Sequence, residues 1–529
     1  MKRILCLLLV LVMLTLAACS GSEGDLSSAD GSADNASAEA ESKDVAATDG
    51  IVVPDISGMS AKDAEAALKN AGFSVKVKEK PDDNVPEGEV ISIDLKAGDS
   101  YKKGTRVWLY ISTGKGLAGE ALNPKPSALV ASRPVLDVGA NSDYQPVNYK
   151  TMKACWISQY DFKSVYSDGS LQYDEDKFRD NVARVFKGLW DKGINTVLVQ
   201  LRPNGDSFYP SAYYCPSKYV TGSYATDFRY DPLSIMVEEA HKVGLSFHGW
   251  INPFRCMDPG DLNIINITYG VRKLAEESMG TSIIKNTDGL LWLNPGSEEA
   301  RKLIVDGATE IVRYYDVDGI HIDDYFYPYN IRENKNFDKT TYESQDEYLT
   351  LDSYRFSNIN KTVSALYAGV KAENPKVLFG VSPAGTPGVA ANVYVDYNTW
   401  LSHDNYCDYI MPQIYWGMQL KNSFSKVYDQ WKSFIKVPTI RIIPGMDMTN
   451  VTEGFAGESE YSEFNNNRNV LKNCLQYAIS TGVCDGFSLF SMSGILSPNS
   501  AEYTQASAEE LGNLFELADA MPDGLLGND

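Results

Sequence analysis

Two adjacent carboxylates stand out among the residues of this 529-residue chain that can carry out chemistry. Asp323 and Asp324 lie in the segment DGIHIDDYFYP, which begins as a short apolar run. Neighbouring carboxylates repel each other, so such a pair is unfavourable unless a function uses it. Hydrolysis of a glycosidic bond ordinarily needs two carboxyl groups, one that donates a proton and one that acts as nucleophile or base. The pair is therefore a candidate for this chemistry.

Aromatic and planar polar residues gather in further short motifs. Sugar rings stack their CH faces on aromatic rings, and their hydroxyls hydrogen-bond to amides, guanidinium groups and carboxylates. We therefore predict a sugar-binding site. Its predicted lining is Arg202, Asn204, Asp206, His248, Trp250, Asn252, Arg255, His321, Tyr325, Tyr327, Gln413, Tyr415, Trp416 and Asp447.

Eight short β-rich segments must position these motifs. They are residues 153–157, 196–201, 246–252, 319–323, 377–382, 409–415, 439–444 and 486–491. Amphipathic stretches separate them, and apolar strands alternating with helices indicate a parallel sheet buried on both faces. Eight such units in roughly 350 residues predict an α/β protein with a (β/α)8 TIM-type barrel. A doubly wound sheet is the alternative, but no Gly-rich phosphate loop follows the first strand.

Barrel enzymes carry their catalytic residues at the carboxyl ends of the strands, where these motifs lie. Side chains alternate along a strand, so His321 and Asp323 face the interior while the intervening isoleucine faces the helices. Asp323 is therefore predicted to be the principal catalytic carboxylate, with Asp324 as its partner or acid. Three other acids are candidates for the second carboxylate, namely Asp206, Asp447 and Asp161.

Five motifs resemble, in order, those of the glycosyl hydrolase-like 10 family of barrel glycosidases. They are VQLRPNGDSFYPSAYY, FHGWINPFR, WLNPGSEEAR, DGIHIDDYFYP and DYIMPQIYW, and the resemblance covers residues 150–500. It implies hydrolysis of peptidoglycan-type amino-sugar strands that lack stem peptides or N-acetyl groups. Tyr325 stands where chitinase-like enzymes have their acidic Glu, which argues against catalysis by the substrate's acetamido group.

Two other functions are alternatives. The G-F-R-x-D layout of amylase-like enzymes matches residues 319–323 with His321 in place of Arg, so an α-glucan hydrolase is the alternative enzyme. A glycan-binding lipoprotein without catalysis is the alternative outside enzymes. The adjacent carboxylates argue against this second alternative.

The start of the chain has the pattern of an export signal. A positive start precedes the apolar run 4–16, which is shorter than the ~20 residues of a membrane span. Leu16-Ala17-Ala18-Cys19 resembles the lipobox of bacterial lipoproteins, which implies removal of residues 1–18 and acylation of Cys19. Residues 19–50 are rich in Ser, Ala, Gly and acids, which is typical of a disordered tether. We expect a lipid-anchored protein on the extracytoplasmic face of the cell membrane.

A small α+β unit follows at residues 51–114. Ser60 and Asp63 form a predicted capping box, Gly72 ends the helix, and strands are predicted at 89–93 and 105–111. The segments VPDISGMSAKDAEAALKNAGFSVKV and KKGTRVWLYISTG resemble the PASTA domain. That resemblance implies retention at the cell wall, and a mere spacer is the alternative. Residues 115–149 are interpreted as a linker, and residues 501–529 as a C-terminal helix and tail.

The composition excludes one large class of partner. The chain has 48 Lys+Arg against 70 Asp+Glu, a net charge of −22, whereas nucleic acid binding needs basic residues in excess on the binding face. The six cysteines after Cys19 include no C-x-x-C pair, so we expect no metal site, and no cofactor is indicated. Export permits disulfides, but their pairing cannot be read from spacing. The expected partners are wall glycan, as the substrate, and the membrane.

Overall fold

The computed structural model describes residues 50–80, 85–86, 88–112, 141–167, 172–345, 349–452, 463–464, 467–496, 501–521, 524 and 526. The chain divides into two compact units, residues 1–119 and 120–529. Cys19, the predicted tether and most of the predicted linker lie outside the described residues. Within the described ranges, no helix is both long enough and apolar enough to cross a membrane.

The first unit is a small α+β domain. Its elements are β1 Gly50–Val52, α2 Ala61–Asn70, β2 Ser74–Lys80, β3 Val90–Ile93, β4 Ser100–Lys102 and β5 Arg106–Ser112. The predicted cap is confirmed, because the Ser60 hydroxyl accepts the Asp63 backbone N–H at 3.2 Å. Ala64, Leu68, Val107 and Leu109 are fully buried, so α2 packs on the sheet β2-β5-β3 through one apolar face.

Eight parallel strands build the second unit, and each lies at one of the predicted segments. They are β6 Met152–Ile157, β7 Thr196–Arg202, β10 Ser246–Ile251, β13 Gly319–Ile322, β14 Leu378–Val381, β15 Tyr409–Ile410, β16 Arg441–Ile442 continued by β17 Gly445–Asp447, and β18 Gly486–Phe490. The eight predicted strands are therefore confirmed.

The sheet closes into a barrel. Its hydrogen-bonded order is β16-β15-β14-β13-β10-β7-β6-β18-β17, and every neighbouring pair is parallel. The two ends of this order, β16 and β17, are separated only by residues 443 and 444, so they are two halves of one strand. This closure confirms the (β/α)8 barrel and excludes the doubly wound alternative.

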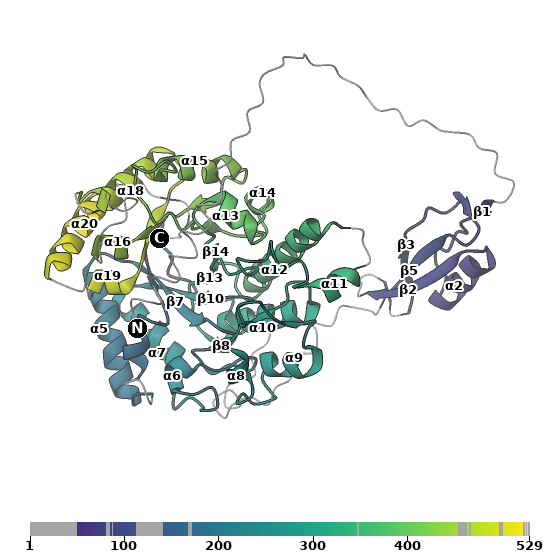
Figure 1. The fold of residues 1–529 in the computed structure, drawn as a ribbon, viewed down its shortest axis with the longest axis horizontal. Helices are drawn as coiled ribbons and strands as arrows, with labels where there is room; N and C mark the ends of the chain where they lie inside the picture. Colours follow the sequence, from purple (N-terminus) through teal and green to yellow (C-terminus); the bar gives the residue numbers. More distant parts are fainter. Residues whose placement is uncertain are drawn as a thin grey trace, which may run out of the picture. The chain divides into compact units, whose positions relative to one another are not determined.

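Helices surround the strands in Figure 1. They are α5 Glu175–Asp191, α7 Pro232–Val243, α10 Glu298–Tyr314, α12 Leu351–Glu373, α13 Pro387–Asn392, α14 Tyr397–Trp400, α15 Phe424–Phe434, α18 Val470–Ser480 and α20 Ala501–Asp519. Local sequence sets their bounds, as α7 illustrates. Asp231 accepts the backbone N–H of Leu233 at 3.1 Å, and Gly244 ends the helix in the left-handed conformation with φ +93°.

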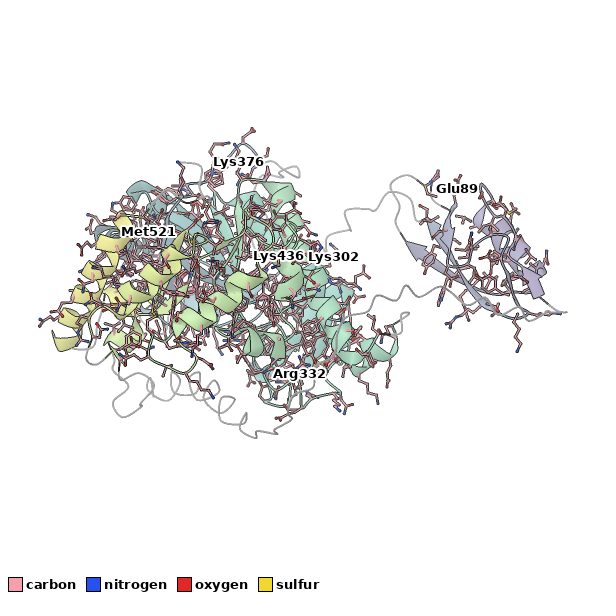
Figure 2. The ribbon with its side chains drawn as sticks, turned by 90° about the horizontal axis from the view of Figure 1, so that it is seen from above. Glu89, Lys302, Arg332, Lys376, Lys436 and Met521 are labelled. Atoms are coloured by element: carbon pink, nitrogen blue, oxygen red, sulfur yellow. The ribbon has the colours of Figure 1, made fainter. Side chains whose placement is uncertain are left out.

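Shorter elements extend the loops of the barrel. The helices are α4 Lys163–Tyr166, α6 Lys218–Thr221, α8 Pro259–Leu262, α9 Gly270–Ser278, α11 Lys339–Glu343, α16 Thr449–Thr452 and α19 Met492–Leu496. The strands are β8 Asp206–Ser207, β9 Cys215–Pro216, β11 Ile283–Lys285 and β12 Leu291–Leu293. Side chains fill the space between these elements and the barrel (Figure 2).

The barrel interior is filled by large side chains, and glycines make room for them. A Cβ atom on Gly319 would lie 2.4 Å from His248 Nδ1, and one on Gly380 would lie 2.0 Å from the ring of Tyr409. Ile320 and Ile322 are fully buried in the large cluster that includes the helices, so the predicted alternation along β13 is confirmed. The six cysteines described in this unit are free, buried thiols.

Candidate active site

The two carboxylates lie at the end of β13, where the chain leaves the barrel. Asp323 is 3% exposed and Asp324 is 4% exposed. The indole N–H of Trp250 donates to Asp323 Oδ2 at 3.1 Å, and the side-chain amide of Asn252 donates to the same oxygen. The backbone N–H of Tyr325 points at the other oxygen from 3.4 Å. Donors from the end of the neighbouring strand β10 and from the turn after β13 therefore fix Asp323 in place.

A chain of amides sets the orientation of Asn252. The backbone N–H of Gln159 donates to Gln200 Oε1 at 2.8 Å, so the other end of the Gln200 amide must be its NH₂ group. That group donates to Asn252 Oδ1 at 2.7 Å, which turns the Asn252 NH₂ toward Asp323. A backbone donor therefore determines, through two side chains, that Asn252 presents a donor to the carboxylate.

Asp324 is held by one amide donor, as Asp323 is, and by one hydroxyl. Gln413 Nε2 donates to Asp324 Oδ1 at 3.2 Å and to the backbone carbonyl of Ser382 at the same distance. The hydroxyl of Tyr329 contacts Asp324 Oδ2. A hydroxyl can donate or accept, whereas the indole and amide groups facing Asp323 Oδ2 only donate. Asp324 can therefore carry a proton and keep its bond to Tyr329.

One cation serves both carboxylates. The positive charge of Arg255 lowers the pKa of Asp323 and of Asp324. Its guanidinium carbon lies 4.8 Å from the centre of the Tyr325 ring, and its Nε donates to Asn204 Oδ1 at 3.1 Å. Arg255, Asn204 and Tyr325 therefore form one contact group around the carboxylates, as the sequence motifs predicted.

Burial controls the protonation of the pair. It is the largest cause that raises the pKa of both Asp323 and Asp324, and the charge of Asp324 raises that of Asp323 further. Arg255 opposes this shift but does not cancel it. Two carboxylates in such proximity hold one proton more readily than none, so one can be an acid while the other stays ionised.

A chain of neutral side chains lies beneath the carboxylates. Trp156 Nε1 donates to His321 Nε2 at 3.3 Å, and His321 Nδ1 is 3.1 Å from the Tyr409 hydroxyl. That hydroxyl is 3.0 Å from His248 Nδ1, and His248 Nε2 is 3.1 Å from Asn148 Oδ1. Burial lowers the pKa of both histidines, to about 4 for His248, so both rings are neutral.

The structure does not bring four of the predicted lining residues to the site. His248 points to the opposite end of the barrel, where Asn148 precedes β6. His321 lies one layer below Asp323, between Trp156 and Tyr409. Both rings are fully buried. The prediction that they line a sugar-binding site is therefore corrected to a role in the packing of the barrel interior.

Arg202 and Tyr327 face away from the barrel interior. The pairing of β7 with β10 skips one residue after Gln200, so Arg202 lies opposite Ile251, which faces the helices. Its guanidinium stacks 4.1 Å from the centre of the Tyr214 ring. The Tyr327 hydroxyl donates to Asp338 at 3.0 Å and is likewise buried outside the interior. The prediction that these two residues line the sugar-binding site is therefore corrected. A bulge turns Arg202 toward the helices, and Tyr327 lies beyond the end of β13, where the alternation of the strand no longer applies.

Three acids that were alternatives for the second carboxylate have structural partners. Asp206 is fully buried and accepts the backbone N–H of Asn204 at 2.8 Å, which shapes the turn that presents Asn204. Asp161 accepts from Ser158 at 2.7 Å and from Ser491 at 3.0 Å, joining the loops after β6 and β18. Asp447 accepts the backbone N–H of Thr449 at 2.7 Å. Each of these contacts stabilises a loop.

Two aromatic residues after β15 differ in their surroundings. Tyr415 is partly buried beside Trp156 and Phe490, with ring centres 6.4 and 5.7 Å away, and the charges of both site carboxylates act on its hydroxyl. Tyr415 therefore adjoins the carboxylates. Trp416 packs against Gly385, where a Cβ atom would lie 2.7 Å from the indole.

Sequence reasoning missed Gln159, Gln200 and Tyr329. Gln200 lies within the motif VQLRPNGDSFYPSAYY, but its importance depends on the neighbour that the barrel gives it, Asn252. Tyr329 follows the motif DGIHIDDYFYP by one residue. The signal available in the sequence was that Gln159 and Gln200 lie at or just after the ends of predicted strands, and that Tyr329 follows a motif rich in polar and aromatic residues.

Family models match both units of the chain. Residues 151–463 match the family model described as Glycosyl hydrolase-like 10, and residues 51–113 match the PASTA domain model. The glycosyl hydrolase YngK of Bacillus subtilis is 29% identical over 414 residues, which are 70% of this chain and 79% of that protein. The glycosyl hydrolase DigH of Escherichia coli K12 is 31% identical over 265 residues, 47% of this chain and 60% of DigH.

Among solved structures, the chain is similar to the PgaB (BpsB) glycoside hydrolase domain from Bordetella bronchiseptica. The TM-score is 0.43 and the sequence identity 11%, and the match covers 70% of this chain and 99% of that domain.

The raised pKa values predict how stability depends on pH. An exposed aspartate has a pKa near ~4, so between that pH and the raised pKa the folded protein keeps a proton that the unfolded chain releases. The free energy of unfolding therefore falls as pH rises through this window. Asp323→Asn removes the repulsion between the carboxylates. We expect the variant to raise the Tm of the barrel unit, and to raise it more at pH 8 than at pH 5, in calorimetry.

The exposed Asp180 on α5, changed to Asn, is the matched control and should leave the pH dependence of the wild-type Tm unchanged. An Asp323→Asn variant whose Tm shift is the same at both pH values would contradict the assigned electrostatics.

Proposed function

This chain belongs to the glycosyl hydrolase-like 10 family, and from that membership we propose that its barrel hydrolyses peptidoglycan-type amino-sugar strands at the Asp323–Asp324 site. The observation that carries the proposal is the buried pair of carboxylates held by directed donors at the end of β13. The proposed substrates are strands without stem peptides or without N-acetyl groups. A wall-associated domain in the same chain, the PASTA domain, supports a wall substrate.

The hydrogen bonds suggest a division of labour between the two carboxylates. The partners of Asp323 Oδ2 are donors only, so they favour the ionised form, which would stabilise or attack the anomeric carbon. Asp324 keeps its contact with Tyr329 in either protonation state, so it is the proposed acid that protonates the leaving oxygen. Gln200 and Asn252 are positioning residues, since they act on the substrate through Asp323.

The residues around the pair would bind the sugar. Trp250 and Tyr415 supply aromatic surfaces beside the carboxylates, while Asn204, Arg255 and Gln413 supply planar donors and acceptors. An α-glucan hydrolase is the second candidate, favoured by the match of residues 319–323 to the amylase-like layout.

Asp323→Asn tests the chemistry. The change is nearly isosteric and removes the charge, so we expect kcat to fall by about 10³-fold or more while KM and folding change little, because each ~1.4 kcal/mol of lost transition-state stabilisation is a tenfold loss in rate. Products released from intact, peptide-stripped and de-N-acetylated wall glycan, and from amylose, are measured by chromatography. Asp180→Asn is the control.

Near wild-type turnover of Asp323→Asn would refute the assignment of Asp323 and make Asp447 the better candidate. Hydrolysis of amylose but not of wall glycan would select the second function. Activity restricted to fully N-acetylated strands would instead indicate the substrate-assisted mechanism.

The PASTA domain is proposed to retain the enzyme on wall glycan. Its fold is a complete small domain with its own core, so a chain without residues 51–114 keeps the barrel unit intact. We expect this deletion to lower the fraction of protein bound to purified sacculi in a pull-down. Equal binding of both chains would leave only the role of a spacer.

Lipid anchoring through Cys19 is proposed from the sequence Leu16-Ala17-Ala18-Cys19. Without the thiol no acyl chain can be attached, so Cys19→Ala should accumulate as unprocessed precursor or be released from the membrane. Cell fractionation with immunoblotting measures both outcomes, and Cys6→Ala, in the apolar run, is the control. Unchanged processing and membrane association of Cys19→Ala would refute the anchor.

A further inference from the structure

An open groove of about 1020 Å³ lies on the flank of the barrel, away from the carboxylates at the strand ends. It runs along α12 and is closed on its other side by α13, α14 and the loop that follows them. Its volume is at the upper end of the ~300–1,000 Å³ typical of ligand sites. The groove is therefore large enough to bind a ligand of several rings.

The groove exists because one barrel connection is built differently from the others. The chain between β14 and β15 contains only the six-residue α13 and the four-residue α14, whereas α10 has 17 residues and α12 has 23. A full-length helix would pack beside α12 at this place. The short helices leave that flank of α12 uncovered, and small side chains there, such as Ser364 and Ala368, keep it open.

One side-chain nitrogen in the wall of this groove is buried without a hydrogen-bond partner among the described residues. Arg301, on the first turns of α10, lines the groove, and its Nε atom is buried with no hydrogen-bond partner among the described residues. Its helix neighbour Lys302, labelled in Figure 2, does have an ion pair, with Asp306 at 2.8 Å. The nearby Glu299 accepts instead from Ser297 at 2.7 Å. The charges of Glu298 and Glu299 also act on Arg301. Buried polar groups are ordinarily satisfied, so the Arg301 Nε–H is still available to an acceptor of a ligand.

The rest of the lining suits a sugar. Phe356 and Tyr397 line the groove and are held by neighbouring rings, since Phe356 lies 5.0 Å from Tyr394 and Tyr397 lies 4.4 Å from Phe434, centre to centre. Rigid aromatic rings are platforms for the CH faces of pyranoses. A second cation, the exposed Lys361, lines the same groove. The groove also contains one carboxylate, Asp396, whose Oδ2 accepts from Asn360 and from Thr399, both at 2.7 Å.

We propose that this groove is a second glycan-binding site, separate from the hydrolytic site, and that it takes an amino-sugar strand bearing free carboxylates. Aromatic rings would hold the sugar faces, and Arg301 with Lys361 would bind the carboxylates. A peptide-stripped wall strand carries one such carboxylate on every second sugar, whereas a chitin oligomer with the same β-1,4 backbone carries none. The choice of strand rests on the proposed function, while the preference for carboxylates rests on the two cations.

Binding of two matched probes tests this proposal. The full chain with Asp323→Asn, which does not consume its ligand, is titrated with labelled peptide-free wall strands and with chitohexaose. We expect Arg301→Gln to weaken wall-strand binding about tenfold, the effect of losing one charge-assisted hydrogen bond, and to leave chitohexaose binding unchanged. Lys361→Gln should act in the same direction. Ala368→Trp fills the groove, so it should remove one binding site per chain for both probes while the hydrolytic site and the PASTA domain keep theirs. Arg184→Gln, on the exposed face of α5, is the matched control.

The outcomes separate the two proposals. Suppose that Arg301→Gln, Lys361→Gln and Ala368→Trp leave the binding of wall-glycan strands unchanged, and that the enzyme with Asp323 intact hydrolyses wall glycan. The groove proposal is then overturned and the proposed function stands. If these variants weaken strand binding but no wall glycan is cleaved, the groove stands and the proposed hydrolysis falls. If Arg301→Gln lowers the affinity for wall strands and for chitohexaose equally, the proposal that Arg301 binds the ligand's carboxylate is overturned. Should Arg301→Gln fail to fold, Lys361→Gln and Ala368→Trp, both at the surface, decide the question.

Discussion

The constraint on which this structure depends is the burial of two neighbouring carboxylates at the end of β13. Burial disfavours both charges and each charge disfavours the other, so the pair persists only where donors and a cation compensate. Trp250 and Asn252 supply the donors, and Arg255 supplies the charge. Each comes from the strand next to β13 or the loop that follows it, so a parallel barrel in correct register is needed to hold the pair.

The barrel interior beneath the carboxylates is filled by hydrogen-bonded polar side chains. Polar side chains at its centre are hydrogen-bonded in a single chain from Trp156 through Tyr409 to Asn148, and both histidines in this chain are neutral. Gly319 and Gly380 provide the space that this chain occupies. The interior is therefore a supporting layer, and the residues that face a substrate are those at the strand ends.

The negative net charge of the chain affects how an acidic glycan can bind. The chain carries −22, which repels carboxylate-bearing strands at a distance, but physiological salt screens this repulsion beyond ~8 Å. Attraction must then come from individual cations at short range. Arg255 beside the catalytic pair, and Arg301 and Lys361 in the flank groove, are placed to supply it.

Local patterns in the sequence determined the eight strands and the inward direction of Asp323, because apolar runs and a two-residue period are properties of short segments. Arg202 was predicted to line the site because it lies at the end of a strand, but a bulge in the pairing of β7 with β10 turns it toward the helices. His248 faces the interior as alternation requires, yet its height along the strand puts it far from the site. The link from Gln200 to Asn252, and the groove beside α12, join segments distant in sequence. These two features are determined only by the closed barrel. Contacts between strands depend on register, and the sequence of a single strand does not encode its register.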